Sequence, residues 1–387
     1  MEVIDSQHPL ADIWAKVQRE ERLTFEDGVR LMNSHDLIAL GHMANYVREK
    51  KHGDHTFFNT NRHINPTNIC QTLCDFCAFG VRMKDPNAYT MSMEEIEHRV
   101  DMIEPDATEV HIVGGNNPQL RIDYYEDMLR RIKQKRPNLH IKAFTGVEID
   151  HFTRVNKMSV AEVMDRLIAA GLDSMPGGGA EIFADEPRSI ICDHKTSGDR
   201  WLEVHEYAHK RGLRTNSTML YNHVESTEDR IDHMLRLRDL QDRTGGFQTF
   251  IPLSWHPDNT ELIKKYPHLT WSTGIDDLKV VAVGRLMLDN FDHIKTYWMQ
   301  VGDKVAQTAL WFGADDIDGN VVEEKIYHAA GAQTKQGMTK LDLVKLIRDA
   351  GRRPVERDTL YNIVNTEFPE PQEKVREVRG SEELTVI

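Results

Sequence analysis

Cysteine is rare in this sequence, with four residues in a chain of 387. So few cysteines cannot form a disulfide framework spread over the whole chain. Long apolar runs are also missing, because no stretch approaches the roughly 18 consecutive apolar residues of a membrane span. The segment from Met1 to Glu20 is mixed and charged instead. We therefore expect a cytoplasmic protein that does not enter a membrane, in a reducing compartment that suits free thiols.

Basic residues are outnumbered by acidic ones, 48 to 62, and the net charge is −14. This charge disfavours nucleic acids and anionic membrane surfaces as partners, because both would be repelled. Apolar residues make up 40% of the chain, enough for the core of one large domain or of two ordinary ones. The composition therefore favours small molecules and an electron donor as partners.

Three of the four cysteines lie within eight residues, in the run CQTLCDFC at 70–77. This spacing predicts one metal site. A structural zinc site usually has four protein ligands in two closely spaced pairs, and no second such pair follows. A 4Fe-4S cubane also normally takes four thiolates, so three predict a cluster with one iron open to a ligand that is not protein. Zinc held by three thiols, and reduced thiols packed in the core, are the alternatives. Cys192 is expected to be a small buried hydrophobic residue and not a fourth ligand.

The C-x-x-x-C-x-aromatic-C spacing, with Phe76 as the aromatic residue, resembles the signature of the radical S-adenosylmethionine (SAM) superfamily. The resemblance implies that Cys70, Cys74 and Cys77 hold a 4Fe-4S cluster and that SAM binds its open iron. It also implies reductive cleavage of SAM to methionine and a 5′-deoxyadenosyl radical, with a donor such as flavodoxin or ferredoxin. Phe76 would shield the cluster near the adenine of SAM, or it simply packs in the core.

Strand-like runs alternate with amphipathic helices through the middle of the chain, which is typical of a parallel sheet covered by helices. The eight predicted strands are 63–69, 109–114, 140–145, 172–175, 214–220, 248–253, 293–298 and 309–312. Helices are predicted at 123–134, 160–167, 200–211, 227–243, 274–288 and 302–308. Ser159 with Glu162, and Ser92 with Glu95, have the spacing of capping boxes at helix starts.

Eight alternations of this size predict an α/β fold, a (β/α)8 TIM-type barrel. We expect N-terminal helices as a cap over 1–55, the barrel over 56–320, and a C-terminal helical extension with a charged tail over 321–387. The tail is expected to begin near Glu367, because prolines and charges follow there.

Chemistry in such a barrel gathers in the loops at the carboxyl ends of the strands. Glycines there allow a ligand to approach the backbone closely, although a turn or a flexible loop explains them as well. The residues that we interpret as contacts to SAM are Phe76, Gly114, Gly115, Glu148, Gly177, Gly178 and Gly179. Asn116 stands where many members of the superfamily have a glutamate, so a charged contact to the SAM ammonium group is in doubt there.

Polar residues alternate with apolar ones over 293–298, which predicts that His293, Lys295 and Tyr297 point into the barrel. Lys295, and Lys142 on an earlier strand, are candidates to bind a substrate carboxylate. His223 and His256 follow two other strands and are candidate acids, bases or carboxylate contacts. Each of these four residues has a plain alternative as a surface or strand-end polar group.

Longer runs narrow the resemblance to the aminofutalosine synthase family of menaquinone biosynthesis. These runs are HINPTNIC at 63–70, EVHIVGG at 109–115, AFTGVEID at 143–150, DSMPGGGAE at 173–181 and TMLY at 218–221. The resemblance implies addition of the 5′-deoxyadenosyl radical to 3-[(1-carboxyvinyl)oxy]benzoate, an aromatic dicarboxylate. Rearrangement and loss of a carboxyl group would then give 6-amino-6-deoxyfutalosine.

Other families share the cysteine loop. They are cyclic dehypoxanthinylfutalosine synthase of the same pathway and the subunit that joins tyrosine to a deazaflavin precursor; both abstract hydrogen. A non-catalytic zinc-binding module is an alternative of another class. The sequence leaves open whether the chain forms a homodimer.

Overall fold

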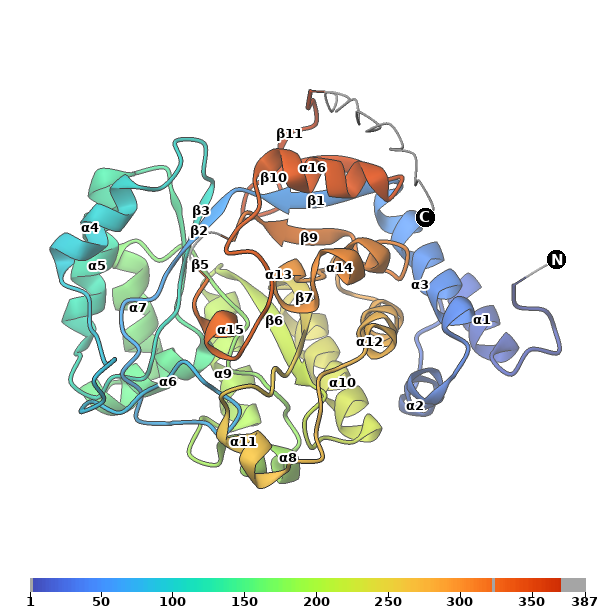
Figure 1. Cartoon of the computed structure of the whole chain (residues 1–387), viewed down its shortest axis with the longest axis horizontal. Helices are drawn as coiled ribbons and strands as arrows, with labels where there is room; N and C mark the ends of the chain where they lie inside the picture. Colours follow the sequence, from blue (N-terminus) through green and yellow to red (C-terminus); the bar gives the residue numbers. More distant parts are fainter. Residues whose placement is uncertain (1–2, 322–323, 370–387) are drawn as a thin grey trace, which may run out of the picture.

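The computed structural model describes residues 3–321 and 324–369, and its central element is a curled sheet of parallel strands (Figure 1). The strands lie in the order β2-β3-β4-β5-β6-β7-β8, which is also their order in the chain. They are β2 (Asn61–Ile64), β3 (Glu109–Ile112), β4 (His140–Ala143), β5 (Ser174–Met175), β6 (Arg214–Tyr221), β7 (Phe247–Ser254) and β8 (His293–Ile294). Because every neighbouring pair in this sheet is parallel, the carboxyl ends of all seven strands lie at one rim.

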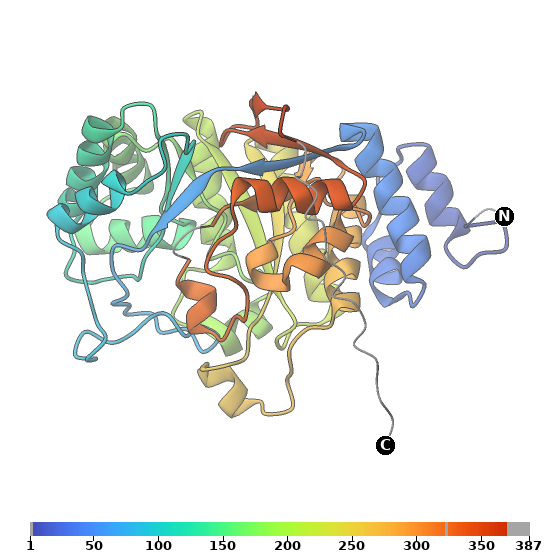
Figure 2. The same cartoon turned by 45° about the horizontal axis from the view of Figure 1, so that its top comes forward.

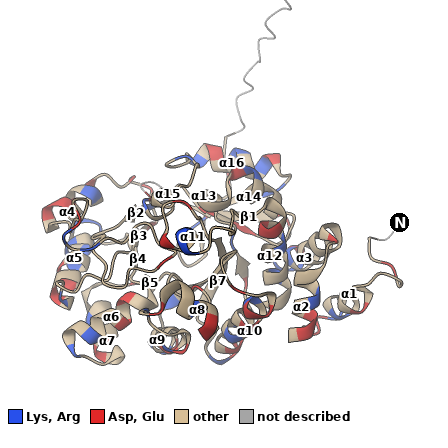
Figure 3. Cartoon of the chain, turned by 60° about the horizontal axis from the view of Figure 1, so that its bottom comes forward, with Lys and Arg blue, Asp and Glu red and all other residues tan. Residues whose placement is uncertain are grey.

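Helices connect the strands and pack outside them, as the alternating pattern predicted. They are α4 (Met93–Asp101), α5 (Ile122–Lys135), α6 (Gly146–Asn156), α7 (Val160–Ala170), α8 (Asp185–Cys192), α9 (Gly198–Lys210), α10 (Thr227–Thr244), α11 (Glu261–Lys265), α12 (Gly274–Met287), α13 (Trp298–Val301) and α14 (Asp303–Ala309). Both predicted capping boxes are confirmed, at Ser92 before α4 and at Ser159 before α7. In the view of Figure 3 the helices around the sheet carry many of the charged residues.

A second sheet of four strands, in the order β11-β10-β1-β9, lies beside the first (Figure 2). Its strands are β1 (His55–Asn59), β9 (Asp316–Gly319), β10 (Arg353–Arg357) and β11 (Ile363–Asn365). Strand β1 runs almost directly into β2, and an isolated bridge joins Lys295 at the end of β8 to Asp316 in β9. Because β9 also pairs with β1, the pairing returns from the last strand of the curled sheet to its beginning.

The predicted eighth strand at 309–312 is wrong. Ala309 ends α14, and the following residues form a turn in which Leu310 is buried. The strand in the eighth position is β9, whose sequence is Asp-Ile-Asp-Gly. A polar strand of this kind has no apolar signature. It can be buried because its acids are paired, as Asp316 is with Arg357 at 2.6 Å.

The ends of the chain flank this core. The N-terminal helices are α1 (Ala11–Gln18), α2 (Phe25–Asn33) and α3 (Leu37–His52), and the C-terminal ones are α15 (Ile326–Ala329) and α16 (Lys340–Asp349). Strands β1, β10 and β11 were not predicted, and the division of the chain at 55 and 320 stays a prediction. The predicted charged tail lies outside the described residues beyond Pro369. None of the described helices is long and apolar enough to cross a bilayer.

Candidate radical SAM site

A cavity of about 290 Å³ opens among the loops that follow the strands of the curled sheet. Its wall brings together ten of the residues that the sequence singled out. They are Cys70, Cys74, Phe76, Cys77, Gly114, Gly115, Glu148, Gly177, Gly178 and Gly179. The loops after β2, β3, β4 and β5 thus converge on one space, as expected for the carboxyl rim of a barrel.

The cysteine loop is fixed by backbone hydrogen bonds to three neighbouring segments. The Gln71 N–H donates to the Asn116 carbonyl at 3.0 Å, and the Asp75 N–H donates to the Ile191 carbonyl at 2.9 Å. The Asp75 carbonyl accepts from the Leu262 N–H of α11 at 2.8 Å. Leu73 has a φ of 44°, a left-handed conformation that costs energy for a residue with a side chain. The loop is therefore held in one unusual shape from outside.

All four cysteines are free thiols. Three sulfurs that bind one zinc ion at about 2.3 Å would lie about 4 Å apart. Among the described residues, the only three potential ligand groups found within 4.8 Å of one another are His52, His293 and Asp315, and Arg285 already binds Asp315. The three cysteine thiols do not all lie within 4.8 Å of one another, so they are not gathered as the ligands of one zinc ion would be. A cubane, which takes a thiolate at each of its corner irons, fits three thiols that line one cavity.

Cys192 contacts the cysteine loop from behind. It is buried at the end of α8, and its thiol interacts with that of Cys74. This interaction, together with burial, raises the pKa of Cys74 well above its usual range. Burial raises the pKa of Cys77 to about 11. Cys192 is not among the residues that line the cavity.

Two of the predicted glycines are required by close backbone packing. A Cβ atom on Gly115 would clash with the backbone carbonyl of Ile69, directly before the first cysteine. A Cβ atom on Gly177 would lie 2.7 Å from the backbone of Ser217 on β6. Both glycines line the cavity, so the missing side chains let neighbouring strand ends come together beside it.

Glu148 joins two of these loops. It completes a capping box with Thr145 at the start of α6, and its carboxylate accepts the Gly114 N–H at 3.0 Å. Burial raises its pKa to about 7 despite these hydrogen bonds. Asn116, in the place of the usual glutamate, is buried and donates to the Thr72 hydroxyl at 2.9 Å. It therefore links the glycine loop at 114–115 to the cysteine loop at 70–77.

Lys195 and Glu181 also line the cavity, and the sequence analysis missed both as site residues. Their side chains form an ion pair, and the Lys195 ammonium lies 5.1 Å from the centre of the Phe76 ring. Burial opposes the charge of Lys195, but Glu181 and the neighbouring thiols outweigh it and raise its pKa. A fixed cation thus stands beside the cysteine loop. No motif in the sequence marks Lys195, because it lies far from both the cysteines and the glycines.

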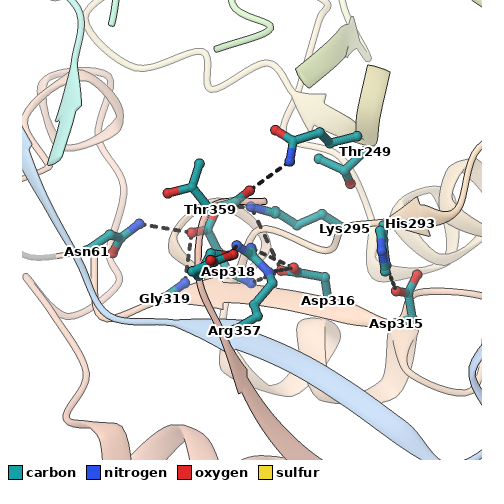
Figure 4. A network of polar contacts seen from close by, with 12 residues as sticks. Asn61, Thr249, His293, Lys295, Asp315, Asp316, Asp318, Gly319, Arg357 and Thr359 are labelled. Carbon is teal, nitrogen blue, oxygen red and sulfur yellow. Dashed lines mark hydrogen bonds and ion pairs between the residues drawn. The ribbon is translucent and has the colours of Figure 1, made fainter. Parts of the chain in front are cut away.

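The two predicted substrate lysines point into the barrel but are already paired. Lys142 lies 2.6 Å from Glu109, with both side chains buried. Lys295 lies 3.1 Å from Asp318 and 3.8 Å from Asp316 (Figure 4). Neither lysine is among the residues that line the cavity. Figure 4 shows Lys295 and Arg357 with Asp316 and Asp318. We call these pairs, together with the pair of Lys142 and Glu109, the floor network.

The two predicted histidines lie away from the cysteine cavity. His223 is buried, where its ring bonds to the Leu220 carbonyl at 3.1 Å and to Glu225 at 2.9 Å. His256 bonds to the Gln300 carbonyl at 3.2 Å and lines a separate cavity together with Trp271. Burial lowers the pKa of His256 to about 4. Catalytic roles for these histidines stay predictions, and their contacts favour structural ones.

Two other histidines, His63 on β2 and His111 on β3, do line the cysteine cavity. They face each other across paired strands, and their rings stack with centres 4.6 Å apart and an angle of 8°. The sequence held a signal for them. In EVHIVGG, His111 lies between Val110 and Ile112, which are fully buried, so alternation along the strand turns the histidine to the other face.

Comparison with known proteins agrees with this geometry. The profile of the radical SAM superfamily matches residues 64–237, and that of the CofH/MqnC C-terminal region matches residues 244–370. Aminodeoxyfutalosine synthase of Thermus thermophilus is 46% identical over 356 residues, which cover 92% of this chain and 96% of that enzyme. This chain belongs to the radical SAM superfamily. The superfamily implies a 4Fe-4S cluster and SAM, and the three cysteines lie where such a cluster would be held.

Two further proteins are similar to this chain at lower identity. The 5-amino-6-(D-ribitylamino)uracil–L-tyrosine 4-hydroxyphenyl transferase of Methanococcoides burtonii is 39% identical over 345 residues, covering 88% of this chain and 96% of that enzyme. The crystal structure of methylornithine synthase aligns with a TM-score of 0.71 at 17% identity, over 88% of this chain and 97% of that one. The second likeness shows that the fold is shared, and it carries nothing about the substrate.

Proposed function

We propose that this radical SAM enzyme is an aminodeoxyfutalosine synthase. It joins the 5′-deoxyadenosyl group of SAM to 3-[(1-carboxyvinyl)oxy]benzoate, with rearrangement and loss of a carboxyl group. The products are 6-amino-6-deoxyfutalosine and methionine. The observation that carries the proposal is the 46% identity to such a synthase over nearly the full length of both chains.

The cavity supports the proposal. We infer that Cys70, Cys74 and Cys77 hold the cluster, and that SAM lies between their loop and the glycine loops. When bound, the cluster supplies the electron that splits SAM into methionine and the 5′-deoxyadenosyl radical. The chain then has to hold the radical carbon close to the alkene and to keep water out. A cavity enclosed by four strand-end loops suits both tasks.

The direct test uses reconstituted, reduced protein under anaerobic conditions with SAM and the carboxyvinyloxybenzoate. We expect an adenosine-containing adduct of the mass of 6-amino-6-deoxyfutalosine, with methionine released in equal amount. The Cys74→Ser variant is the matched control and should form neither. Free 5′-deoxyadenosine as the main product would contradict the proposal and favour the relatives that abstract hydrogen.

Two other functions are tested in parallel. Incubation with tyrosine and 5-amino-6-(D-ribitylamino)uracil tests the transferase activity, since a relative of that name is 39% identical. Incubation with dehypoxanthine futalosine tests the cyclase that the sequence resemblance left open. Colourless protein with one bound zinc after reconstitution would instead support a metal-binding module. The physiological electron donor, the cytoplasmic location and a homodimer stay predictions.

A further inference from the structure

The stacked rings of His63 and His111 present polar groups to the cavity, and no described residue is paired with them. His63 is 9% exposed, and both rings line the cavity. Among the described residues, neither ring makes a hydrogen bond or an ion pair. His111 is partly buried, and the ring nitrogens of both histidines are open to the cavity. Polar groups at a cavity wall that have no protein partner are available to a polar ligand.

The nearby acids do not fill that role, because each already has partners. Asp318 accepts hydrogen bonds from Asn61 at 3.2 Å and from Lys295 at 3.1 Å. Glu324 accepts the backbone N–H groups of Ile326 at 2.7 Å and of Tyr327 at 3.0 Å. These acids also do not join the two histidines in any group of described ligands within 4.8 Å, so the arrangement is not a metal site.

The chemistry of the rings favours an anion. Burial lowers the pKa of both histidines, that of His111 to about 3, so both rings are neutral at pH 7. Each neutral ring then offers one N–H donor. Two parallel donors on adjacent strands can reach the two oxygens of one carboxylate, and hydrogen bonds to a charged acceptor are the stronger ones.

The position of the pair decides which carboxylate it meets. His111 precedes Gly114 by three residues, so it lies about 10 Å deeper along the strand than the glycine loop. The vinyl carbon of the substrate must lie near SAM, at the loops, and the ring carboxylate is at the far end of the molecule. Tyr297 and Tyr327 also line the cavity, edge to face with ring centres 5.7 Å apart, and offer an aromatic wall.

We propose that His63 and His111 form the binding site for the ring carboxylate of the aromatic substrate. This assignment rests on the proposed function and names the residues that recognise its substrate. The residues proposed to hold the cluster and to contact SAM stay the same. It assigns to two neutral imidazoles the role that the sequence pattern predicted for Lys142 and Lys295.

The test measures binding by calorimetry to the reconstituted enzyme with SAM and without reductant, so that no turnover occurs. Three ligands are compared: the full substrate, 3-(vinyloxy)benzoate, which keeps the ring carboxylate, and 2-phenoxyacrylate, which lacks it. The variants are His63→Asn and His111→Asn. His140→Asn is the control, because this ring lies on the next strand and outside the cavity, bonded to Ser174.

We expect each cavity variant to raise the Kd of the two benzoates by about 10-fold or more. The Kd of 2-phenoxyacrylate should be unchanged, and the control should bind all three ligands like the wild type. The proposal is overturned if the variants leave the Kd of the benzoates unchanged or raise the Kd of all three ligands equally. It is also overturned if the variants weaken only the binding of SAM. Wild-type protein that binds no benzoate would overturn both this proposal and the proposed function. If the wild type forms the adduct in the turnover assay and both variants bind the benzoates normally, only the present proposal is overturned.

A second measurement uses wild-type enzyme and does not depend on the folding of the variants. Diethyl pyrocarbonate modifies accessible histidines, and peptide mass spectrometry locates the modified rings. We expect 3-(vinyloxy)benzoate to protect His63 and His111 and 2-phenoxyacrylate to leave them reactive. Equal protection by both ligands, or by neither, contradicts the assignment.

Discussion

The wall of the cavity and the floor network both contain polar side chains in the interior of the protein, and they differ in whether those side chains have protein partners. In the floor, Lys142, Lys295 and Arg357 each have an acid within about 3 Å. In the wall, the three thiols point at a shared space, and His63 and His111 have no partner among the described residues. The difference teaches that a buried charge does not by itself mark a ligand site. Polar groups that line a cavity and have no protein partner are better candidates, because their hydrogen-bonding capacity is open to a ligand.

The largest effect should come from the thiols of the wall. Replacing Cys70, Cys74 or Cys77 by serine should abolish both the visible absorption of the cluster and the cleavage of SAM, because each removes one of only three ligands. Cys192→Ser is the matched control, since it changes a thiol that touches Cys74 but does not line the cavity. A Cys192→Ser protein that loses its cluster would show that a fourth ligand exists.

The floor network should respond through stability. Lys142→Met leaves the buried carboxylate of Glu109 without its cation, and we expect a loss of about 3–5 kcal/mol in the free energy of unfolding. The double variant with Glu109→Gln should recover part of that loss, because it removes the stranded charge. Denaturant unfolding of the cluster-free protein measures both. Normal stability combined with weaker benzoate binding would instead make Lys142 a substrate ligand.

Glu148 belongs to the wall, and it makes no ion pair with a described residue. Burial raises its pKa to about 7 from 4.5. The native state therefore keeps a proton that the unfolded chain releases, and stability falls as the pH rises through this interval. Glu148→Gln does not titrate and should remove about 2–3 kcal/mol of that fall. Its one amide oxygen can accept from only one of the two backbone N–H groups that Glu148 binds, so the variant is also less stable at every pH. Unfolding at pH 5 and pH 8 in both proteins measures it, and equal slopes would contradict the raised pKa.

The smallest effect should come from an ion pair at the surface. Lys135 lies 2.7 Å from Asp101, much as Lys142 does from Glu109, but its partner is 59% exposed. Lys135→Met should change the free energy of unfolding by at most about 1 kcal/mol, because water and salt screen the pair. A loss as large as that of Lys142→Met would mean that burial does not set the difference.

Residues whose role follows from their spacing along the chain could be predicted from the sequence. Residues whose role depends on a partner far away in the chain could not. The cysteines and glycines stand at fixed intervals after strands, and the helices follow apolar periodicity and capping boxes. Strand β9 was not predicted, because its acids are buried by pairing with basic residues far away in the chain. Lys142 and Lys295 were placed inside the barrel, but nothing in their own segments shows the acids beside them.

The pairing of β9 with β1 also sets an order for assembly. Phe57 pairs with Asp316, so the last gap in the ring of strands is filled by a segment that the ribosome makes long after the cysteine loop. Contacts so distant in the chain form slowly, since a long loop must close before they can. The cluster-binding loop is therefore translated in full while the strand that closes the ring around it has yet to be made.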